Sequence, residues 1–411
     1  ARYAPPVKSP LDILALEPWL GGSHAVFLES WAARSRHRLR LEGLKPRHWR
    51  WRMRAGAWEL ARRIKDQEPP DVLFVSDYVD LPSLFGFLPR SWSEVPTLLY
   101  LHENQLTYPG QEGAEEPDFH LGFTNILSCV RADAVVFNSA WHRDDFQRAA
   151  IELLGKLPKP NPRVDLLARL EEAAVVSPGV ETESIPLGCG GDGPLRVAFN
   201  HRWEHDKDPI GFLDAVIEAR DAGARIEVVM LGESFERTPD GMAERLERLG
   251  NALLWSGFKP DQAEYARALG ECDLVVSTAR HEFYGIALLE GLACGCSPLA
   301  PNRLAYPEHL PKEDLYADHA GLCAALARAA AQVSRWRNSD LRAGRRELAQ
   351  SHAAEQTAFQ LDAACEACAA ACASRASCSS SCSCSISARS ASASACSLAA
   401  RSSAAALCMV A

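Results

Sequence analysis

The sequence predicts an α/β protein in which two doubly wound, Rossmann-like domains face each other across a cleft. Three observations lead to this prediction. Short apolar runs of strand length alternate with helical patterns in both halves of the chain. A stretch rich in glycine and proline separates the two halves, and 411 residues are enough for two domains with sizeable cores.

The first half, residues 1–184, contains five apolar runs that are typical of buried strands. Helical patterns separate most of these runs. Strands that alternate with helices pair in parallel and form a sheet covered on both faces. The runs are LDILALEP (11–18), DVLFVSD (71–77), VPTLLYLHE (95–103), DAVVFNS (133–139) and AAVVSPG (173–179).

Residues 185–194, IPLGCGGDGP, lack hydrophobic periodicity and predict an interdomain linker. The alternation resumes in residues 195–362, where we expect helices near 208–222, 260–269 and 285–294. In such sheets ligands bind beyond the carboxyl ends of the strands, here facing the cleft. The expected strands are LRVAFNH (195–201), RIEVVMLGE (225–233), NALLWSG (251–257), CDLVVST (272–278) and CSPLAP (296–301).

From Ala363 onward the composition changes abruptly to alanine, serine, cysteine and arginine. Such a segment, 363–411, cannot bury a core, so we expect it to be disordered. Its cysteines lack a partner histidine and regular spacing, which argues against a metal-binding tail. A frame-shifted terminus is a further hypothesis for this composition.

The bulk composition is that of a soluble globular protein, with 47% hydrophobic and 24% charged residues. No apolar run approaches the roughly 18 residues of a membrane span. There is also no cationic start followed by an apolar signal core, so we expect a cytoplasmic location. The cysteines before residue 361 show no paired CxxC spacing and predict buried free thiols.

The net charge of −9 is unevenly distributed. Between Arg34 and Lys65 there are 12 lysines and arginines and two acids, so this stretch carries +10 and the rest of the chain −19. Cations interleaved with tryptophan suit phosphate contacts and stacking on exposed bases. We assign Arg50, Arg52 and Arg54 to acceptor binding on this basis; the alternative is a solvated basic face with the tryptophans packed inward.

The stretch HEFYGIALLEG, residues 281–291, carries two carboxylates on either side of a helix start. Gly285 permits a close backbone approach, and the free N–H groups at the start of the helix favour a phosphate. From the second helical turn Glu290 can reach a ribose diol, and Glu282 can meet hydroxyls of a hexose beyond the phosphates. A pair of surface glutamates flanking a buried helix is the alternative interpretation.

Two cations, Arg202 and Lys207, lie five residues apart at the end of the first strand of the second half. Fixed cations at this place can neutralise a diphosphate leaving group. With Glu282 and Glu290 at another strand end, they predict a nucleotide-sugar site. We include the preceding Asn200 among the donor-binding residues.

This combination, R-x4-K and then E-x7-E, resembles the retaining glycosyltransferases of family 4, which have the GT-B fold. The resemblance implies that Arg202 and Lys207 face the diphosphate, that Glu282 and the backbone near Gly285 and Ile286 face the sugar and phosphates, and that Glu290 faces the ribose. It implies no essential metal and no other cofactor. It also implies that the last helix packs back on the first domain, which the tail composition puts in question.

Five motifs, four in the first half and one at the start of the second, narrow the resemblance to the tRNA-queuosine alpha-mannosyltransferases, over about residues 10–360. The motifs are EPWLGGSH, YLHENQLTYP, VVFNSAWHRDDF, VVSPGV and FNHRWEHDKDP. The resemblance implies GDP-mannose as donor and tRNA containing queuosine as acceptor, in the anticodon of tRNA-Asp. Two alternatives stay open: a family 4 transferase with a lipid-linked or small-molecule acceptor, and a non-enzymatic RNA-binding protein that kept the fold.

In the first half, polar residues follow two of the expected strands. Gly21 and Gly22 allow the loop after the first strand to approach donor phosphate, and His24, which opens the following helix, is a candidate for acceptor contact. An ordinary tight turn is the alternative there. At the end of VPTLLYLHE, His102 can hydrogen-bond the transferred sugar, and Glu103 and Asn104 can order the loop or bind the acceptor diol.

The resemblance implies that the acceptor attacks the face that the diphosphate leaves. Catalysis then consists of leaving-group stabilisation and orientation. The departing phosphate can take the acceptor proton, so the sequence analysis assigns no nucleophile. The catalytic residues it proposes are Arg202, Lys207, Glu282 and His102. Oligomeric state is not predicted by any of these features.

Overall fold

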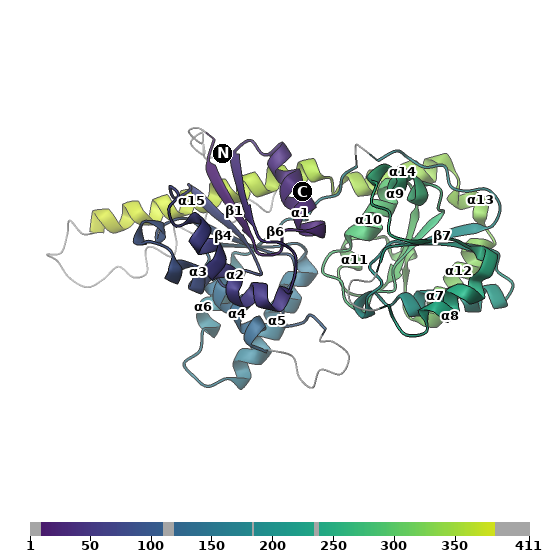
Figure 1. The fold of residues 1–411 in the computed structure, drawn as a ribbon, viewed down its shortest axis with the longest axis horizontal. Helices are drawn as coiled ribbons and strands as arrows, with labels where there is room; N and C mark the ends of the chain where they lie inside the picture. The colour runs from purple at the N-terminus through teal and green to yellow at the C-terminus, as the bar shows by residue number, and fades with distance from the viewer. Residues whose placement is uncertain (1–9, 110–118, 183–184, 234–237, 383–411) are drawn as a thin grey trace.

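A computed structural model describes residues 10–109, 119–182, 185–233 and 238–382. Figure 1 shows two lobes, each built around one sheet with helices on both of its faces. Each sheet has six strands, and all strand pairs in the described parts of both sheets are parallel. The predicted fold class, two doubly wound α/β domains, is confirmed.

The first sheet has the strand order β2-β1-β3-β4-β5-β6. Its central strands are buried along their whole length, which explains why they read as continuous apolar runs. The elements of this domain are β1 (Asp12–Glu17), α1 (Gly22–Arg34), β2 (Arg38–Gly43), α2 (Trp49–Ile64), β3 (Val72–Ser76), α3 (Leu81–Phe87), η1 (Arg90–Trp92), β4 (Thr97–Leu101), α4 (Phe119–Arg131), β5 (Ala134–Phe137), α5 (Ala140–Lys156), α6 (Arg163–Glu171) and β6 (Ala174–Val175).

The second sheet has the strand order β12-β11-β10-β7-β8-β9. Asp208, Asp261 and Asp318 cap the helices that follow them by accepting a backbone hydrogen bond. The elements are β7 (Leu195–Phe199), η2 (His205–Lys207), α7 (Pro209–Asp221), β8 (Ile226–Leu231), α8 (Met242–Leu249), η3 (Gly250–Ala252), β9 (Leu253–Gly257), α9 (Gln262–Gly270), β10 (Leu274–Val276), α10 (Ile286–Ala293), β11 (Ser297–Pro301), α11 (Tyr306–His309), η4 (Lys312–Asp314), β12 (Leu315–Tyr316), α12 (His319–Ala330), α13 (Val333–Trp336) and α14 (Ser339–Gln350).

All ten expected strands and the three helices expected in the second half are present, mostly trimmed by a few residues at their ends. The sequence analysis missed one edge strand of each sheet, β2 and β12. The strand β2 has the sequence RLRLEG and lies inside the basic stretch, where its arginines masked the apolar alternation. Residues 185–194 form no helix or strand, and Gly188 and Gly190 donate backbone hydrogen bonds to the second domain.

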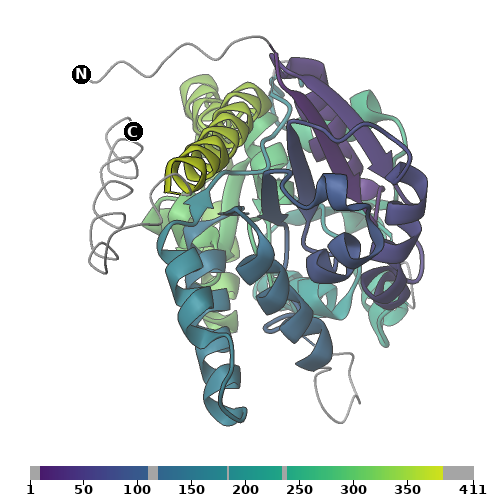
Figure 2. The same ribbon diagram turned by 90° about the vertical axis from the view of Figure 1, so that its left-hand side faces the viewer.

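The prediction of a disordered segment from Ala363 is wrong for residues 363–382. These residues continue helix α15 (Ala354–Cys382), which leaves the second lobe and runs along the first (Figures 1 and 2). Buried side chains of α15, among them Leu361, Cys365 and Cys368, join the core of the first sheet. Small residues allow this packing, so the last helix closes on the first domain; residues 383–411 lie outside the described residues.

A buried carboxylate fastens α15 to the first domain. Asp362 accepts hydrogen bonds from Trp31 Nε1 (2.8 Å), Ser35 Oγ (2.6 Å) and the backbone N–H of Arg36 (2.9 Å). Its side chain is only 2% exposed, so water cannot replace these contacts.

We therefore expect Asp362→Ala to lower the free energy of unfolding by about 1–3 kcal/mol, because it leaves buried donors without an acceptor. Urea unfolding followed by circular dichroism measures this loss. The matched control is Glu355→Ala on the same helix, where an ion pair with Arg34 involves a carboxylate that is 44% exposed. Equal stability changes in the two variants would contradict the assigned role of Asp362.

No helix within the described ranges is long and apolar enough to cross a membrane.

Candidate active site

The carboxyl ends of the two sheets meet where the domains touch. Ser139, which follows β5, donates a hydrogen bond from Oγ to the carbonyl oxygen of Phe283 at 2.7 Å. The ring centroids of His142 and Phe283 lie 4.3 Å apart, and those of Tyr108 and His281 lie 5.5 Å apart. The HEFYG segment of the second domain is thus packed directly against the loops of the first.

The two predicted cations differ in their surroundings. Lys207 Nζ lies 3.1 Å from the carboxylates of Glu282 and Asp206, and it donates to the carbonyl oxygen of His281 at 3.0 Å. The side chain of Arg202 is 48% exposed, and its nearest carboxylate contact, Asp206, is 3.9 Å away. Lys207 is therefore held in place by the protein, whereas Arg202 can turn toward a ligand.

Glu282 is ionised at neutral pH because of this lysine. Burial alone would raise the pKa of Glu282, but the charge of Lys207 lowers it to about 2. An ionised carboxylate only accepts hydrogen bonds, as the hydroxyls of a hexose require.

Helix α10 begins at Ile286, directly after Gly285, as predicted. Gly285 has a φ of 105°, in the left-handed region, and an added Cβ would lie 2.9 Å from the ring of Tyr306. Only glycine fits this bend without strain. The bend leaves the first N–H groups of α10 at the end of β10, where a helix start can bind an anion.

Glu290 belongs to a chain of part-buried hydrogen bonds. Tyr265 donates its hydroxyl to Glu290 at 2.6 Å, and Asn200 donates from Nδ2 to Tyr265 at 2.9 Å and to the carbonyl oxygen of Ala287 at 2.6 Å. The Oδ1 of Asn200 is buried and has no partner among the described residues. The structure thus brings two predicted donor residues, Asn200 and Glu290, together across β7 and α10.

Burial raises the pKa of Glu290 to about 7, although the hydrogen bond from Tyr265 opposes this shift. A ribose diol donates best to the carboxylate, so we expect the affinity for GDP to rise as the pH increases from about 6 to 8. Titration calorimetry with GDP at both pH values measures this change. Glu290→Gln should bind GDP more weakly and without this dependence; a variant that keeps it would show that another group titrates.

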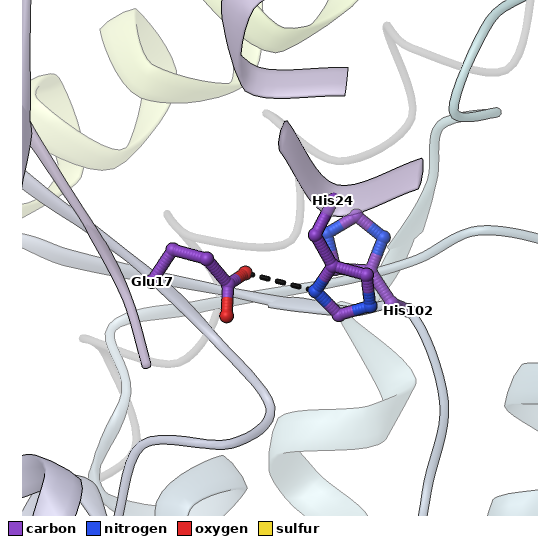
Figure 3. Close-up of side chains that lie close together, drawn as sticks. All are labelled: Glu17, His24 and His102. Atoms are coloured by element: carbon purple, nitrogen blue, oxygen red, sulfur yellow. Dashed lines mark hydrogen bonds and ion pairs between the residues drawn. The ribbon is translucent and has the colours of Figure 1, made fainter. Parts of the chain in front are cut away.

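His24 and His102 lie together at the strand ends of the first domain (Figure 3). Their rings stack with centroids 4.1 Å apart, and Nδ1 of His24 lies 3.0 Å from Oε2 of Glu17. Burial alone would lower the pKa of His24, but Glu17 and nearby acids raise it to about 9, so His24 is a cation. Burial and this cation hold the pKa of His102 well below its usual range, so His102 is neutral.

Two groups of side chains could hold a metal ion in the part of the chain that the structure describes. They are Glu17, His24 and His102, and, on the surface of the second domain, Glu218, His319 and Cys323. In the first group Nδ1 of His24 already contacts Glu17, and the charge of Glu17 raises the pKa of His24, so the two form an ion pair. This group suits an ion pair better than a metal centre.

Glu103 and Asn104 have different roles in the loop after β4. Glu103 accepts hydrogen bonds from the hydroxyl of Tyr78 (2.7 Å) and from Gln105 (2.8 Å) at the rim of the site. Asn104 is fully buried and accepts from the N–H groups of Leu106 and Thr107, both at 3.0 Å. Asn104 therefore orders the loop, which is one of the two roles predicted for it, and its contact with the acceptor stays a prediction.

The two glycines after β1, Gly21 and Gly22, also differ in their surroundings. A Cβ on Gly21 would collide with the ring of Pro46, so this glycine serves a close contact within the protein. Gly22 has a φ of 54° and open space around its Cα. Of the two, Gly22 is the one whose surroundings leave room for a ligand.

Tyr108 and Glu17 belong to this site, although the sequence analysis gave neither a role. Tyr108 lies near Arg202 across the domain boundary, and burial with Glu103 nearby raises the pKa of Tyr108 to about 12. Glu17 is fully buried beside His24. Both residues lie inside the quoted motifs YLHENQLTYP and EPWLGGSH, so their position beside other polar residues was the available signal.

The three predicted acceptor arginines lie on helix α2, which places Arg50 and Arg54 on one side and Arg52 on another. Arg50 and Arg54 are exposed. The side chain of Arg52 is 13% exposed and forms an ion pair of 2.7 Å with Glu59. Arg52 is thus engaged within the protein, and its predicted role in acceptor binding stays a prediction.

Proteins of similar sequence show which family the chain belongs to. A tRNA-queuosine alpha-mannosyltransferase from Drosophila melanogaster is 33% identical over 321 residues, covering 74% of this chain and 83% of the relative. The chain belongs to the tRNA-queuosine alpha-mannosyltransferase family. The family model "tRNA-queuosine alpha-mannosyltransferase N-terminal" matches residues 12–180, and "Glycosyl transferases group 1" matches residues 191–334. The protein is a glycosyltransferase, and the predicted family is confirmed.

More distant relatives of this family member share its architecture. A GDP-mannose-dependent alpha-(1-6)-phosphatidylinositol dimannoside mannosyltransferase from Mycobacterium tuberculosis is 27% identical, over 60% of this chain and 61% of the relative. Similar solved structures include a sucrose-phosphate synthase from Thermosynechococcus elongatus, with TM-score 0.64, 16% identity, and 85% and 97% of the two chains covered. Another is Anabaena HepE in complex with UDP and glucose, with TM-score 0.60, 14% identity, and 85% and 98% covered. The fold is GT-B.

Proposed function

We propose that the protein transfers mannose from GDP-mannose to the cyclopentene diol of queuosine in tRNA, with retention at the anomeric carbon. The observation that carries the proposal is the cluster of Arg202, Lys207, Glu282 and Glu290 at the strand ends of the second domain, in a chain with a 33% identical tRNA-queuosine alpha-mannosyltransferase relative. A relative of this specificity acts on tRNA, and a cytoplasmic location suits that substrate.

On the donor side, each part of a nucleotide sugar has a matching group. Glu290, with Asn200 beside it, suits the ribose hydroxyls. The start of α10 at Gly285 and Ile286 suits the diphosphate, whose charge Arg202 and Lys207 offset. Glu282, held ionised by Lys207, accepts hydroxyl hydrogen bonds from the hexose. We propose that no metal ion is needed, because these two cations supply the charge stabilisation.

In the proposed transfer, the bond from the anomeric carbon to the diphosphate oxygen breaks. A queuosine hydroxyl oxygen forms the new bond on the same face, and its proton passes to the departing diphosphate. Arg202 and Lys207 stabilise the charge that develops on the leaving group. The neutral ring of His102, whose Nε2 is buried without a partner in the described part of the chain, can hydrogen-bond the sugar.

On the acceptor side, Glu103, His24 and Gly22 border the same space from the first domain. The cation His24 and the acceptor oxygens of Glu103 lie next to Tyr78, which contacts both residues. These groups offer hydrogen bonds to a diol. Helix α2, with Arg50 and Arg54 exposed, offers phosphate contacts farther out.

Mass spectrometry of nucleosides tests the proposal. Purified protein is incubated with queuosine-containing tRNA and, separately, GDP-mannose, GDP-glucose, UDP-glucose and UDP-galactose. We expect a hexose added to queuosine only with GDP-mannose. Transfer from another donor with none from GDP-mannose would overturn the donor assignment, and modification of tRNA that lacks queuosine would overturn the acceptor assignment.

A second function is favoured by one observation, the 27% identity to a mannosyltransferase named for a phosphatidylinositol dimannoside acceptor. A lipid-linked acceptor would keep the same donor site. Adding a phosphatidylinositol mannoside to the assay separates the two functions, because product on the lipid and none on tRNA would support the second.

A further inference from the structure

Helices α7 and α12 carry three metal-ligating side chains that are no part of the candidate active site. The two helices pack side by side in the second lobe (Figure 1) and share a core that includes Phe212 and Leu322. Glu218 lies in the last turn of α7, and His319 and Cys323 lie at the start of α12. Because His319 and Cys323 are four positions apart, they occupy the same side of α12, which here faces Glu218.

The ligand atoms of these side chains form a small triangle. Nε2 of His319 lies 3.1 Å from Oε2 of Glu218. Sγ of Cys323 lies 3.5 Å from the same oxygen and 3.6 Å from Nε2 of His319. One carboxylate oxygen, one imidazole nitrogen and one sulfur thus converge from two helices, and a shared core holds those helices in place.

The sides of this triangle match the edges of a zinc coordination tetrahedron. Zinc bonds are about 2.3 Å long to sulfur and about 2.0–2.1 Å long to nitrogen or oxygen. At the tetrahedral angle, such bonds place the sulfur about 3.6 Å from either other ligand, and the nitrogen about 3.3 Å from the oxygen. The three observed separations agree with these values to within a few tenths of an ångström.

The chemistry of the three ligands also selects among cations. Magnesium and calcium prefer oxygen ligands only, whereas thiolate together with imidazole suits zinc. Three protein ligands leave the fourth tetrahedral position open. The side chains of His319 and Glu218 are 47% and 59% exposed, so an ion from solution can reach the triangle and a water molecule can complete its coordination.

A surface ion pair between His319 and Glu218 is the alternative interpretation of this cluster. It explains the separation of 3.1 Å between the nitrogen and the oxygen. It gives no role to the thiol of Cys323, which lies within 3.6 Å of both partners. Cys323 is therefore the residue that distinguishes the two interpretations.

We propose that Glu218, His319 and Cys323 bind one zinc ion, with water as the fourth ligand. The thiol of Cys323 releases its proton to solvent when the metal binds, so that the ligand is the thiolate. The bound ion links α7 to α12 and stabilises the second domain. It takes no part in the proposed sugar transfer, because none of the three residues belongs to the donor or acceptor groups described above.

Titration of the full chain with cobalt(II) tests the proposal, because cobalt(II) replaces zinc and absorbs light. After treatment with EDTA and its removal, the parent protein should bind cobalt(II) with a charge-transfer band from the thiolate and the strong visible bands of a tetrahedral site. Added zinc should abolish these bands. Cys323→Ser should lose the charge-transfer band, and His319→Ala and Glu218→Gln should weaken binding, the histidine variant by about 100-fold or more.

Thermal unfolding gives a second measurement of the same site. An ion that binds only the folded protein raises the melting temperature. Zinc should therefore raise the melting temperature of the parent protein, and EDTA should reverse the change. Neither Cys323→Ser nor His319→Ala should respond to zinc in this way.

Other cysteines of the chain supply matched controls. Cys189 is exposed and lies outside the triangle, and Cys372 is half-buried on α15, near the cysteine-rich end of the chain. Cys189→Ser and Cys372→Ser should keep the thiolate band and the response to zinc. Circular dichroism of every variant should match that of the parent protein, because none of the replaced side chains is fully buried.

Each other outcome would overturn the proposal. If the parent protein shows no saturable thiolate band and no rise in melting temperature, the cluster is a plain ion pair. If the band persists in Cys323→Ser and disappears in Cys372→Ser, the metal binds at the end of the chain. If Cys323→Ser loses the band while His319→Ala and Glu218→Gln bind cobalt(II) as the parent does, the thiol acts without the other two residues.

Discussion

Lys207→Ala is expected to abolish sugar transfer and to lower the free energy of unfolding by about 3–5 kcal/mol, because it removes the cation from a buried ion pair. Lys207 is 12% exposed, and the carboxylates it contacts, Glu282 and Asp206, are 16% and 9% exposed. Both would be left without their closest positive partner. Thermal and urea unfolding, together with the transfer assay, measure the two losses.

The pH dependence of this loss has a defined sign. The pKa of Glu282 is about 2 in the folded protein and 4.5 in its ordinary state, so its contribution to stability is present above pH 4.5. It disappears as the pH falls through the folded pKa. The stability difference between the parent protein and Lys207→Ala should therefore shrink between pH 4.5 and 2.

A double variant gives the control. Lys207→Met/Glu282→Gln removes both charges of the pair, so it should recover part of the stability while remaining inactive. If Lys207→Ala is as stable as the parent protein, the lysine is not the partner that keeps Glu282 ionised.

Arg202→Ala is expected to reduce turnover on the order of 10²-fold and to leave stability within about 0.5 kcal/mol of the parent. The side chain is 48% exposed, so its loss uncovers little buried surface. In the reaction, however, it offsets charge that appears on the leaving diphosphate. Initial rates at saturating GDP-mannose measure the effect on the chemical step.

The matched control for Arg202 is Arg245→Ala, on α8, where the guanidinium pairs with Asp214 at 2.6 Å and its side chain is 29% exposed. It should leave the rate unchanged. A near-normal rate in folded Arg202→Ala would refute its assignment to the donor site. Together, the predictions for Lys207 and Arg202 distinguish a residue that also stabilises the fold from one that only contacts the ligand.

Much of the fold could be predicted because central strands are buried on both faces and read as continuous apolar runs. The edge strand β2 escaped this reasoning, since Arg38 and Arg40 alternate with leucine and Arg40 pairs with Asp12. Helix α15 escaped because alanine and cysteine looked too small to form a core. Packed beneath the aromatic cluster that contains Trp31 and Phe74, those small side chains fit closely.

In the candidate site, too, some features could be predicted from the sequence and others could not. Spacing along the chain was enough to predict Arg202, Lys207, Glu282 and Glu290, because strand ends and helix starts are local features. The roles of neighbouring residues depended on contacts that no spacing contains. Asn104 faces its own loop, Gly21 faces Pro46, and Tyr108 reaches Arg202 from the other domain.

The sequence by itself determined the two α/β domains, the order of their strands along the chain and the presence of a nucleotide-sugar motif, because these follow from local periodicity and spacing. Only the tertiary structure decided which of the charged side chains form ion pairs within the protein. Acids from β1, α15 and α2 itself pair with six arginines of the basic stretch, namely Arg34, Arg36, Arg40, Arg52, Arg63 and, more distantly, Arg38. Because ion pairing depends on distance in space, the sequence showed only an excess of positive charge, and the fold decided which acids lie close enough to these arginines to pair with them.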